Sequence, residues 1–239
     1  MKKFEYTPPE QPRELILKLG QKITDRIGHT VTAEDPEYYG LEALVTDEMA
    51  EVALKMKVRK PMTLAQIVKA TGKEEKVLEE LLQEMSNIGL LEYNWENPKH
   101  EKQYVLPMYV PGSAEFFNMK LDQIKEHPEV ASFFERMAFL PLQKVTPMVP
   151  PGGAGIGMHV IPVEKAIETE NESVSVEHIS HWLDKYDGKY AAGPCSCRYS
   201  RGVLGEGCAD DPEDWCIGVG DMADYLVETN KGHYITREK

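Results

Sequence analysis

The sequence KEEKVLEELLQEMS (residues 73–86) decides the architecture of the first half of the chain. Its apolar side chains recur at the spacing of one helical face, which predicts an amphipathic helix with five residues inward: Val77, Leu78, Leu81, Leu82 and Met85. Glutamates and lysines fill most other positions and predict a solvated opposite face.

Two shorter helices are predicted before this helix and a hairpin after it. Thr46 is a good N-cap for the first of them, and Thr63 caps a second that ends at the Thr71–Gly72 turn. Alternating segments at residues 90–95 and 102–106, joined by turn residues, predict two paired strands. Three helices and a two-stranded wing are typical of a winged helix-turn-helix, which we assign to residues 41–112.

The regions on either side have simpler patterns. Residues 1–40 contain a predicted helix, Arg13–Ile27, closed by Gly28, and then a polar connector. Residues 113–162 contain two predicted helices, near 114–126 and 129–139, followed by a Pro/Gly-rich connector.

The last region, residues 163–239, is predicted to form a small domain around four cysteines. It contains an amphipathic helix, a strand at residues 189–192 and a final helix near residues 218–228. The fold class expected for the whole chain is α+β, mostly helical, with a winged helix-turn-helix and a small four-cysteine metal or cluster domain.

Composition restricts the classes of partner. The 239 residues carry 40 acidic and 27 basic side chains, a formal charge of −13, which argues against a general nucleic-acid or anionic-membrane surface. No apolar run approaches the roughly 18 residues of a membrane-spanning helix, and the basic start lacks the apolar stretch of a signal peptide. We therefore expect no membrane insertion and a cytoplasmic location.

The helix that would read DNA is itself acidic. In a winged helix-turn-helix the third helix enters the major groove, where phosphate contacts need Lys and Arg. The predicted helix instead carries five glutamates against two lysines: Glu74, Glu75, Glu79, Glu80 and Glu84 against Lys73 and Lys76. We expect a scaffold or docking surface rather than a DNA reader, and a homodimer formed through this unit is a further expectation.

The four cysteines form one cluster in the sequence. Cys195, Cys197, Cys208 and Cys216 have the spacing C-x-C-x10-C-x7-C, and no other cysteine occurs. In a reducing compartment such a cluster is more typical of a metal site than of disulfides. Glycines at 193, 202, 205, 207, 218 and 220 would supply the backbone angles that a wrapped loop needs.

Spacing alone leaves the occupant open. Iron–sulfur clusters and structural zinc both use four cysteines, but zinc sites usually have two close C-x2-4-C pairs, and only Cys195 and Cys197 form a close pair here. A cysteine set without metal is the third interpretation.

Several stretches of the last region resemble a known module. VIPVEKAI (160–167), GPCSCR (193–198), LGEGC (204–208) and GDMADY (220–225) resemble a segment of iron–sulfur proteins of anaerobic bacteria, the 4Fe–4S ferredoxin-type proteins and pyridine nucleotide-disulfide oxidoreductases. The likeness covers roughly residues 147–238 and, more loosely, the winged helix. It implies a cluster, with [4Fe–4S] favoured and zinc as the alternative.

The resemblance also implies a role and partners. Cys195, Cys197, Cys208 and Cys216 would be the cluster ligands in an electron-transfer module. In that family ferredoxin-type cysteine runs follow, sometimes with a flavin domain, and none occurs in this sequence. Because Thr236 has the character of an N-cap without its helix, we expect the N-terminal part of a larger oxidoreductase, whose partner is either these downstream domains or a separate redox protein.

Other motifs carry less weight. The glycines of residues 152–157 lack the flanking strand and helix of a dinucleotide loop, and His178 and His181 are not needed as ligands beside four cysteines. No motif identifies a catalytic residue or a substrate, so we assign no catalytic site within this segment. A redox- or metal-sensing winged-helix regulator and a structural zinc module for protein assembly remain the alternative functions.

Overall fold

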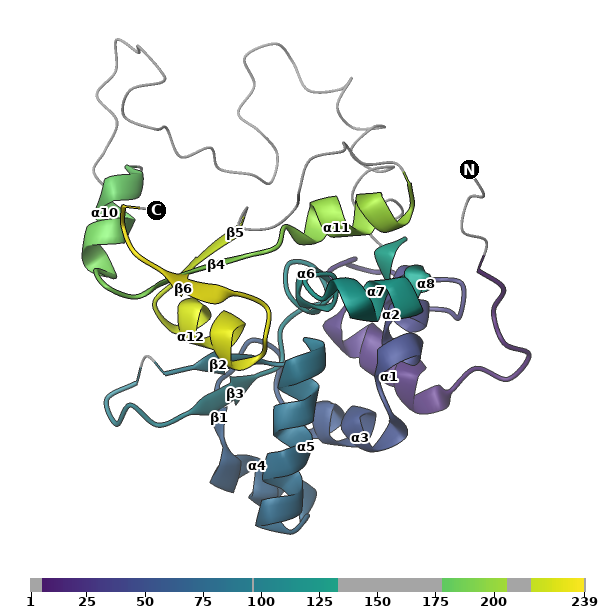
Figure 1. Ribbon diagram of the computed structural model, residues 1–239. Coiled ribbons are helices and arrows are strands. Elements are labelled where there is room, and N and C mark those ends of the chain that lie inside the picture. The colour runs from purple at the N-terminus through teal and green to yellow at the C-terminus, as the bar shows by residue number, and fades with distance from the viewer. Residues whose placement is uncertain (1–5, 96, 133–177, 206–215, 239) are drawn as a thin grey trace.

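Two small antiparallel sheets organise the described part of the chain, and helices pack around both (Figure 1). The computed structural model describes residues 6–95, 97–132, 178–205 and 216–238. Helices account for more of these residues than strands do, so the predicted α+β class is confirmed.

The first helix is shorter than predicted. Helix α1 (Glu14–Ile23) buries one apolar face, formed by Ile16, Leu19 and Ile23. The prediction that it reaches Ile27 is wrong, because α1 ends at Ile23 and the Ile27 side chain is fully exposed. The chain turns away there as Thr24 and Arg26 bond to the buried carboxylate of Glu37, at 2.6 and 2.5 Å.

Helix α2 (Pro36–Leu44) occupies a stretch for which a polar connector was predicted, and it spans the predicted boundary at residue 40. Pro36 suits the first helical position, where its missing N–H has no intrahelical partner to lose. Helix α3 (Asp47–Lys55) follows, and the Thr46 hydroxyl accepts a hydrogen bond from the Met49 N–H at 3.2 Å, so the predicted N-cap is confirmed.

The next elements follow the predicted order of helices and hairpin. Helices α4 (Leu64–Thr71) and α5 (Glu75–Ile88) precede strands β2 (Glu92–Asn94) and β3 (Gln103–Val105), which pair antiparallel. The sequence missed a two-residue strand, β1 (Met62–Thr63), which pairs with β3 and gives the sheet order β1-β3-β2.

The buried face of α5 differs from the prediction at one residue. Leu78, Leu81, Leu82 and Met85 are buried, but Val77 is 52% exposed. The four buried positions follow the spacing i, i+3, i+4, i+7 of a single helical stripe, and Val77 lies at its margin.

After the first sheet, two short helices occupy the region of the single helix predicted near 114–126: α6 (Ser113–Phe117) and α7 (Leu121–Glu126). A third, α8 (Pro128–Ala131), lies at the start of the helix predicted at 129–139. The break between α6 and α7 follows Asn118, whose amide donates to the Ala114 and Val130 carbonyls instead of facing solvent. Most of the predicted helix at 129–139 and the whole Pro/Gly-rich connector lie outside the described residues.

The last region supplies the second sheet. Its elements are α10 (Ile179–Lys185), β4 (Tyr190–Gly193), α11 (Ser196–Val203), β5 (Cys216–Val219), α12 (Asp221–Glu228) and β6 (His233–Ile235). Strand β4 confirms the strand predicted at residues 189–192. Helix α12 confirms the predicted final helix but begins at Asp221, because residues 218–219 belong to β5. The sheet order is β5-β4-β6. Thr236, predicted as an N-cap, directly follows β6, and residues 237–238 form a turn.

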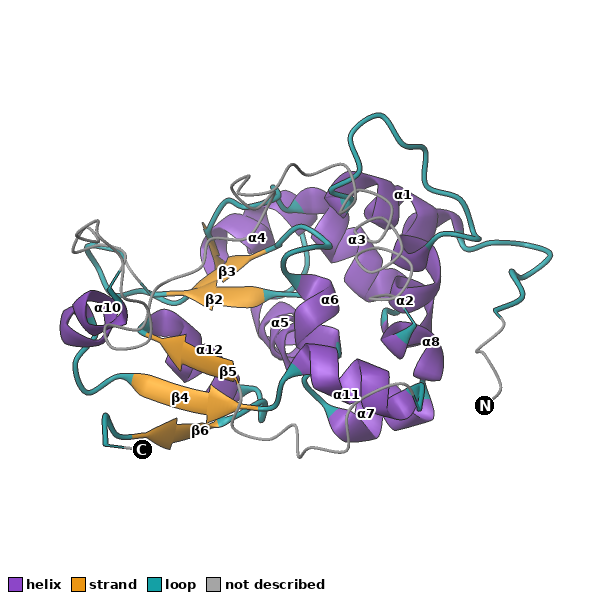
Figure 2. Ribbon diagram, turned by 90° about the horizontal axis from the view of Figure 1, so that it is seen from above, coloured by secondary structure: helices purple, strands orange, loops and turns teal. Residues whose placement is uncertain are grey.

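The two sheets are bridged by one helix. Helix α12 contacts all three strands of the second sheet and also β2 of the first (Figure 2). Buried residues of the last region, among them Tyr199, Tyr225 and Leu226, belong to the same hydrophobic cluster as Leu82 and Met85 of α5. The cysteine-bearing region thus packs directly on the first unit.

Candidate metal centre

Strand pairing brings the described cysteines together. Cys195 follows β4 and is the N-cap residue of α11, Cys197 lies in the first turn of α11, and Cys216 is the first residue of β5. Because Gly193 pairs with Cys216 across the two strands, the end of β4 lies beside the start of β5. Cys208, the fourth predicted ligand, lies outside the described residues.

The three described thiols are free and interact with one another. Cys195 lies near enough to Cys197 and Cys216 for its charge to influence both thiols. Burial, and after it the charge of Cys195, raises the pKa of Cys216 to about 11. The same two causes, burial first, raise the pKa of Cys197.

The donor set is chemically uniform. Within the described ranges no group of three or more His, Cys, Asp or Glu side chains is placed to hold a metal ion. The three thiols that converge are nevertheless all sulfur donors, the ligand type of iron–sulfur clusters and structural zinc. The case for a cluster or a zinc ion at this place therefore rests on the sulfur chemistry of the three side chains and on their positions at the neighbouring ends of β4, α11 and β5.

Two of the six predicted glycines meet the expectation of an unusual backbone angle. Gly205, which follows α11, has a φ of 69°, and Gly220, which precedes α12, has a φ of 59°. Gly193 is needed for another reason: an added Cβ would lie 2.4 Å from the Lys231 carbonyl oxygen. Gly207 lies outside the described residues.

Lys231 is the buried group beside this site that the sequence analysis missed. Its side chain is 1% exposed, and its ammonium donates to the Ser86 and Asn87 carbonyls at the end of α5, both at 2.9 Å. No local signal marks it, because both acceptors lie more than 140 residues away. Burial lowers the pKa of Lys231 well below its usual range.

The histidines discounted from sequence do not gather with the cysteines into a metal-binding group among the described residues. His178 is the N-cap residue of α10, and the ring of His181 packs edge-on against Trp182 at 5.4 Å.

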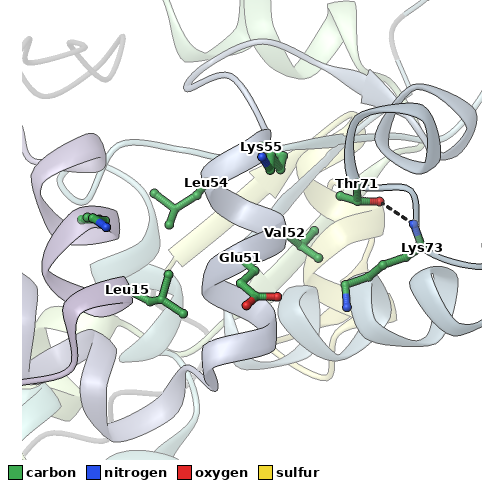
Figure 3. Close-up of a pocket in the computed structure, with 8 residues that line it drawn as sticks. Leu15, Glu51, Val52, Leu54, Lys55, Thr71 and Lys73 are labelled. Carbon is green, nitrogen blue, oxygen red and sulfur yellow. Dashed lines mark hydrogen bonds between the residues drawn. The ribbon is translucent and has the colours of Figure 1, made fainter.

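A separate cavity of about 410 Å³ lies between α1, α3 and the α4–α5 turn, with Leu15, Val52 and Leu54 as its apolar part (Figure 3). Thr71 and Lys73 form its far edge, where the Thr71 hydroxyl accepts from the Lys73 N–H at 3.3 Å. Two of its lysines already have carboxylate partners, in the pairs Lys18–Glu14 at 2.6 Å and Lys73–Glu48 at 2.7 Å. We therefore do not take it as the functional site.

Comparisons of the chain with protein-family models, curated proteins and solved structures gave no match. A search of the described residues also found no helix with the length and apolarity needed to cross a bilayer.

Proposed function

We propose that Cys195, Cys197, Cys208 and Cys216 hold an iron–sulfur cluster, with [4Fe–4S] favoured, and that the protein is a one-electron-transfer module. The observation that carries this proposal is the convergence of three thiols from β4, α11 and β5. When bound, the cluster would supply the redox chemistry, and the chain would fix its position and environment. We assign no catalytic residue.

The first unit would act as the scaffold that presents this module. The order α3, β1, α4, α5, β2, β3 and the sheet order β1-β3-β2 support a winged helix over residues 41–112. Glu74 is the N-cap residue of α5, and four more glutamates lie on its exposed side: Glu75, Glu79, Glu80 and Glu84. Such a face repels phosphates, so the regulator that reads DNA is disfavoured and a protein-docking role is favoured.

The proposed module would act inside, or together with, a larger oxidoreductase. Its partner would be a further redox domain or a separate redox protein, because a one-electron carrier passes its electron to another redox centre. Free thiols at Cys195, Cys197 and Cys216 suit a reducing, cytoplasmic setting.

The test is metal and sulfide analysis of the full chain, purified without oxygen and then reconstituted with iron and sulfide. A cluster would give a brown protein that absorbs broadly near 400 nm, with iron and acid-labile sulfide in similar amounts. Cys195→Ser and Cys216→Ser should each lose most of the iron, whereas Ser200→Ala, on the same helix as Cys197, should keep it.

Two outcomes would contradict the proposal. Stoichiometric zinc that iron and sulfide cannot replace would establish the structural zinc module instead. Iron content that is unchanged in both cysteine variants would show that the thiols are not ligands.

A further inference from the structure

A second cavity, of about 510 Å³, opens at the junction of the first unit and the cysteine-bearing region. Four segments meet there: the α6–α7 turn, the end of β4, α11, and the turn from α12 to β6 (Figures 1 and 2). Its lining consists of Met119, Lys120, Leu121, Asp122, Gly193, Pro194, Tyr199, Asn230, Lys231, Gly232 and His233. The volume is in the range of small-molecule sites.

Part of the cavity wall is formed by two backbone segments that approach each other closely. A Cβ on Gly193 would lie 2.4 Å from the Lys231 carbonyl oxygen, and one on Gly232 would lie 2.5 Å from the Ala192 carbonyl oxygen. Two glycines therefore allow β4 and the turn before β6 to approach each other and leave main chain at the cavity surface. A wall made this way is fixed by neighbouring strands and does not depend on flexible side chains.

The charge of the cavity lining is opposite in sign to the net charge of the whole chain. The protein carries a net −13, yet the cavity is lined by two lysines, Lys120 and Lys231, with Asp122 as the one carboxylate among the lining residues. Asp122 is exposed. An anion at this place would meet a locally favourable potential.

The two lysines have different roles. The Lys231 ammonium is bonded to the carbonyls of Ser86 and Asn87 and is buried, so it is not available to a ligand. Lys120 is half-buried, and within the described part of the chain it has no ion-pair partner. Its positive charge also contributes, after burial, to the lowered pKa of Lys231, so the two amino groups lie near each other.

We propose that this cavity binds a small ligand with an anionic oxygen group, a carboxylate or a phosphate, paired with the ammonium of Lys120. Asn230, on the turn before β6, lies in the same lining, and its side-chain amide is a hydrogen-bond donor for such a group. The ligand would lie against Gly193 and Pro194, the two residues that precede Cys195. The proposal rests on the cavity and its charges and holds whether or not a cluster is bound.

The cavity of Figure 3 is the internal comparison. Its lining also includes lysines, but Lys18 and Lys73 are paired with Glu14 and Glu48. Lys18→Met is therefore a matched control, since it removes a cavity lysine whose charge is already balanced.

The experiment is titration of the full chain with inorganic phosphate and, separately, with citrate, at constant ionic strength adjusted with chloride. Affinity is measured by calorimetry, and the contacted residues by amide NMR shifts. We expect saturable binding with shifts at Gly193, Gly232 and His233. Loss of a charge-assisted hydrogen bond should make Lys120→Met bind about tenfold more weakly or worse, whereas Lys120→Arg and Lys18→Met should bind like the wild type.

The relative affinities for phosphate and citrate identify which anionic group the cavity prefers. Absence of saturable binding of either probe up to about 10 mM would overturn the proposal. The proposal would also be overturned if Lys120→Met, with the melting temperature of the wild type, bound the probes with unchanged affinity. Amide NMR shifts confined to the cavity around Lys18 would overturn it as well.

Discussion

At the scale of single residues, Gly193 shows how closely the cysteine-bearing region is fitted to the rest of the chain. It pairs with Cys216 on one side, and a Cβ at its position would lie 2.4 Å from the Lys231 carbonyl oxygen on the other. That oxygen belongs to backbone, which cannot rotate aside as a side chain can. The absence of a side chain at Gly193 is therefore a condition of the fold.

Gly193→Ala should lower the free energy of unfolding by about 1–3 kcal/mol, because the added methyl group forces β4 and the turn before β6 apart. Gly202→Ala is the matched control. Gly202 lies in α11 with nothing within 4 Å of an added Cβ, so alanine should be neutral or stabilising by about 1 kcal/mol or less. Urea denaturation measures both, and equal effects of the two substitutions would contradict the steric argument.

Residue types revealed part of the candidate site in advance. The cysteines were visible because four of them stand in one short segment, and Gly193 because it lies beside them. Lys231 was invisible, since a lysine is ordinarily exposed and its acceptors, Ser86 and Asn87, are remote in sequence. The burial of Lys231 depends on tertiary contacts, and no local sequence pattern indicates those contacts.

At the scale of elements, the end of α5 depends on a residue from another unit. The last carbonyls of a helix have no intrahelical donor. Here the Asn87 carbonyl accepts a hydrogen bond from the Lys231 ammonium. The Ser86 carbonyl accepts from the same ammonium and from the Tyr225 hydroxyl at 3.3 Å, in addition to the Gly89 N–H at 3.1 Å. The turn between α12 and β6 thereby completes a helix that begins far earlier in the chain.

This arrangement predicts a pH dependence of stability. Burial holds the pKa of Lys231 in the folded state well below the 10.5 of the unfolded state. Between those values the unfolded chain binds more protons, so stability rises with pH, by at most about 1.4 kcal/mol per pH unit. As the pH rises toward 10.5, the wild type should therefore gain stability relative to Lys231→Met.

Thermal or urea unfolding at several pH values measures this slope. Lys18→Met is the control, because Lys18 is largely exposed and its loss should leave the slope of the wild type unchanged. If Lys231→Met keeps the wild-type slope, Lys231 is not the group that titrates.

Elements with local signals were predicted well, and elements that depend on remote partners were not. The caps at Thr46 and Thr63 are formed by side chains within three residues of the N–H groups they bind, so the sequence displays them. Strand β1 is only two residues long and exists because β3 pairs with it. The exit of the chain after α1 depends on Glu37, which lies on a different helix.

At the scale of the whole molecule, the helix α12 makes the two sheets parts of one structure. Tyr225 is fully buried, with its ring 5.3 Å from that of Tyr93 on β2 and 4.9 Å from that of Phe116 on α6. At the surface of the same junction, Lys102 pairs with Glu228 at 2.9 Å. Composition suggested separate units in sequence, and only the packing reveals the shared core.

The shared core predicts that the two units unfold together. Tyr225→Ala removes a buried aromatic ring from the junction and should lower the free energy of unfolding by about 3–5 kcal/mol, whereas Tyr225→Phe loses only the hydroxyl bond to Ser86 and should lower it by about 1 kcal/mol.

Variants that retain only Trp95, at the end of β2, or only Trp182, on α10, report each unit separately by fluorescence. With intact Tyr225 their denaturation curves should coincide with each other and with circular dichroism, the mark of one cooperative transition. Two separated transitions in the variants that keep Tyr225 would contradict this prediction. They would show that the two units are independently stable and that Tyr225 only contributes to the contact between them.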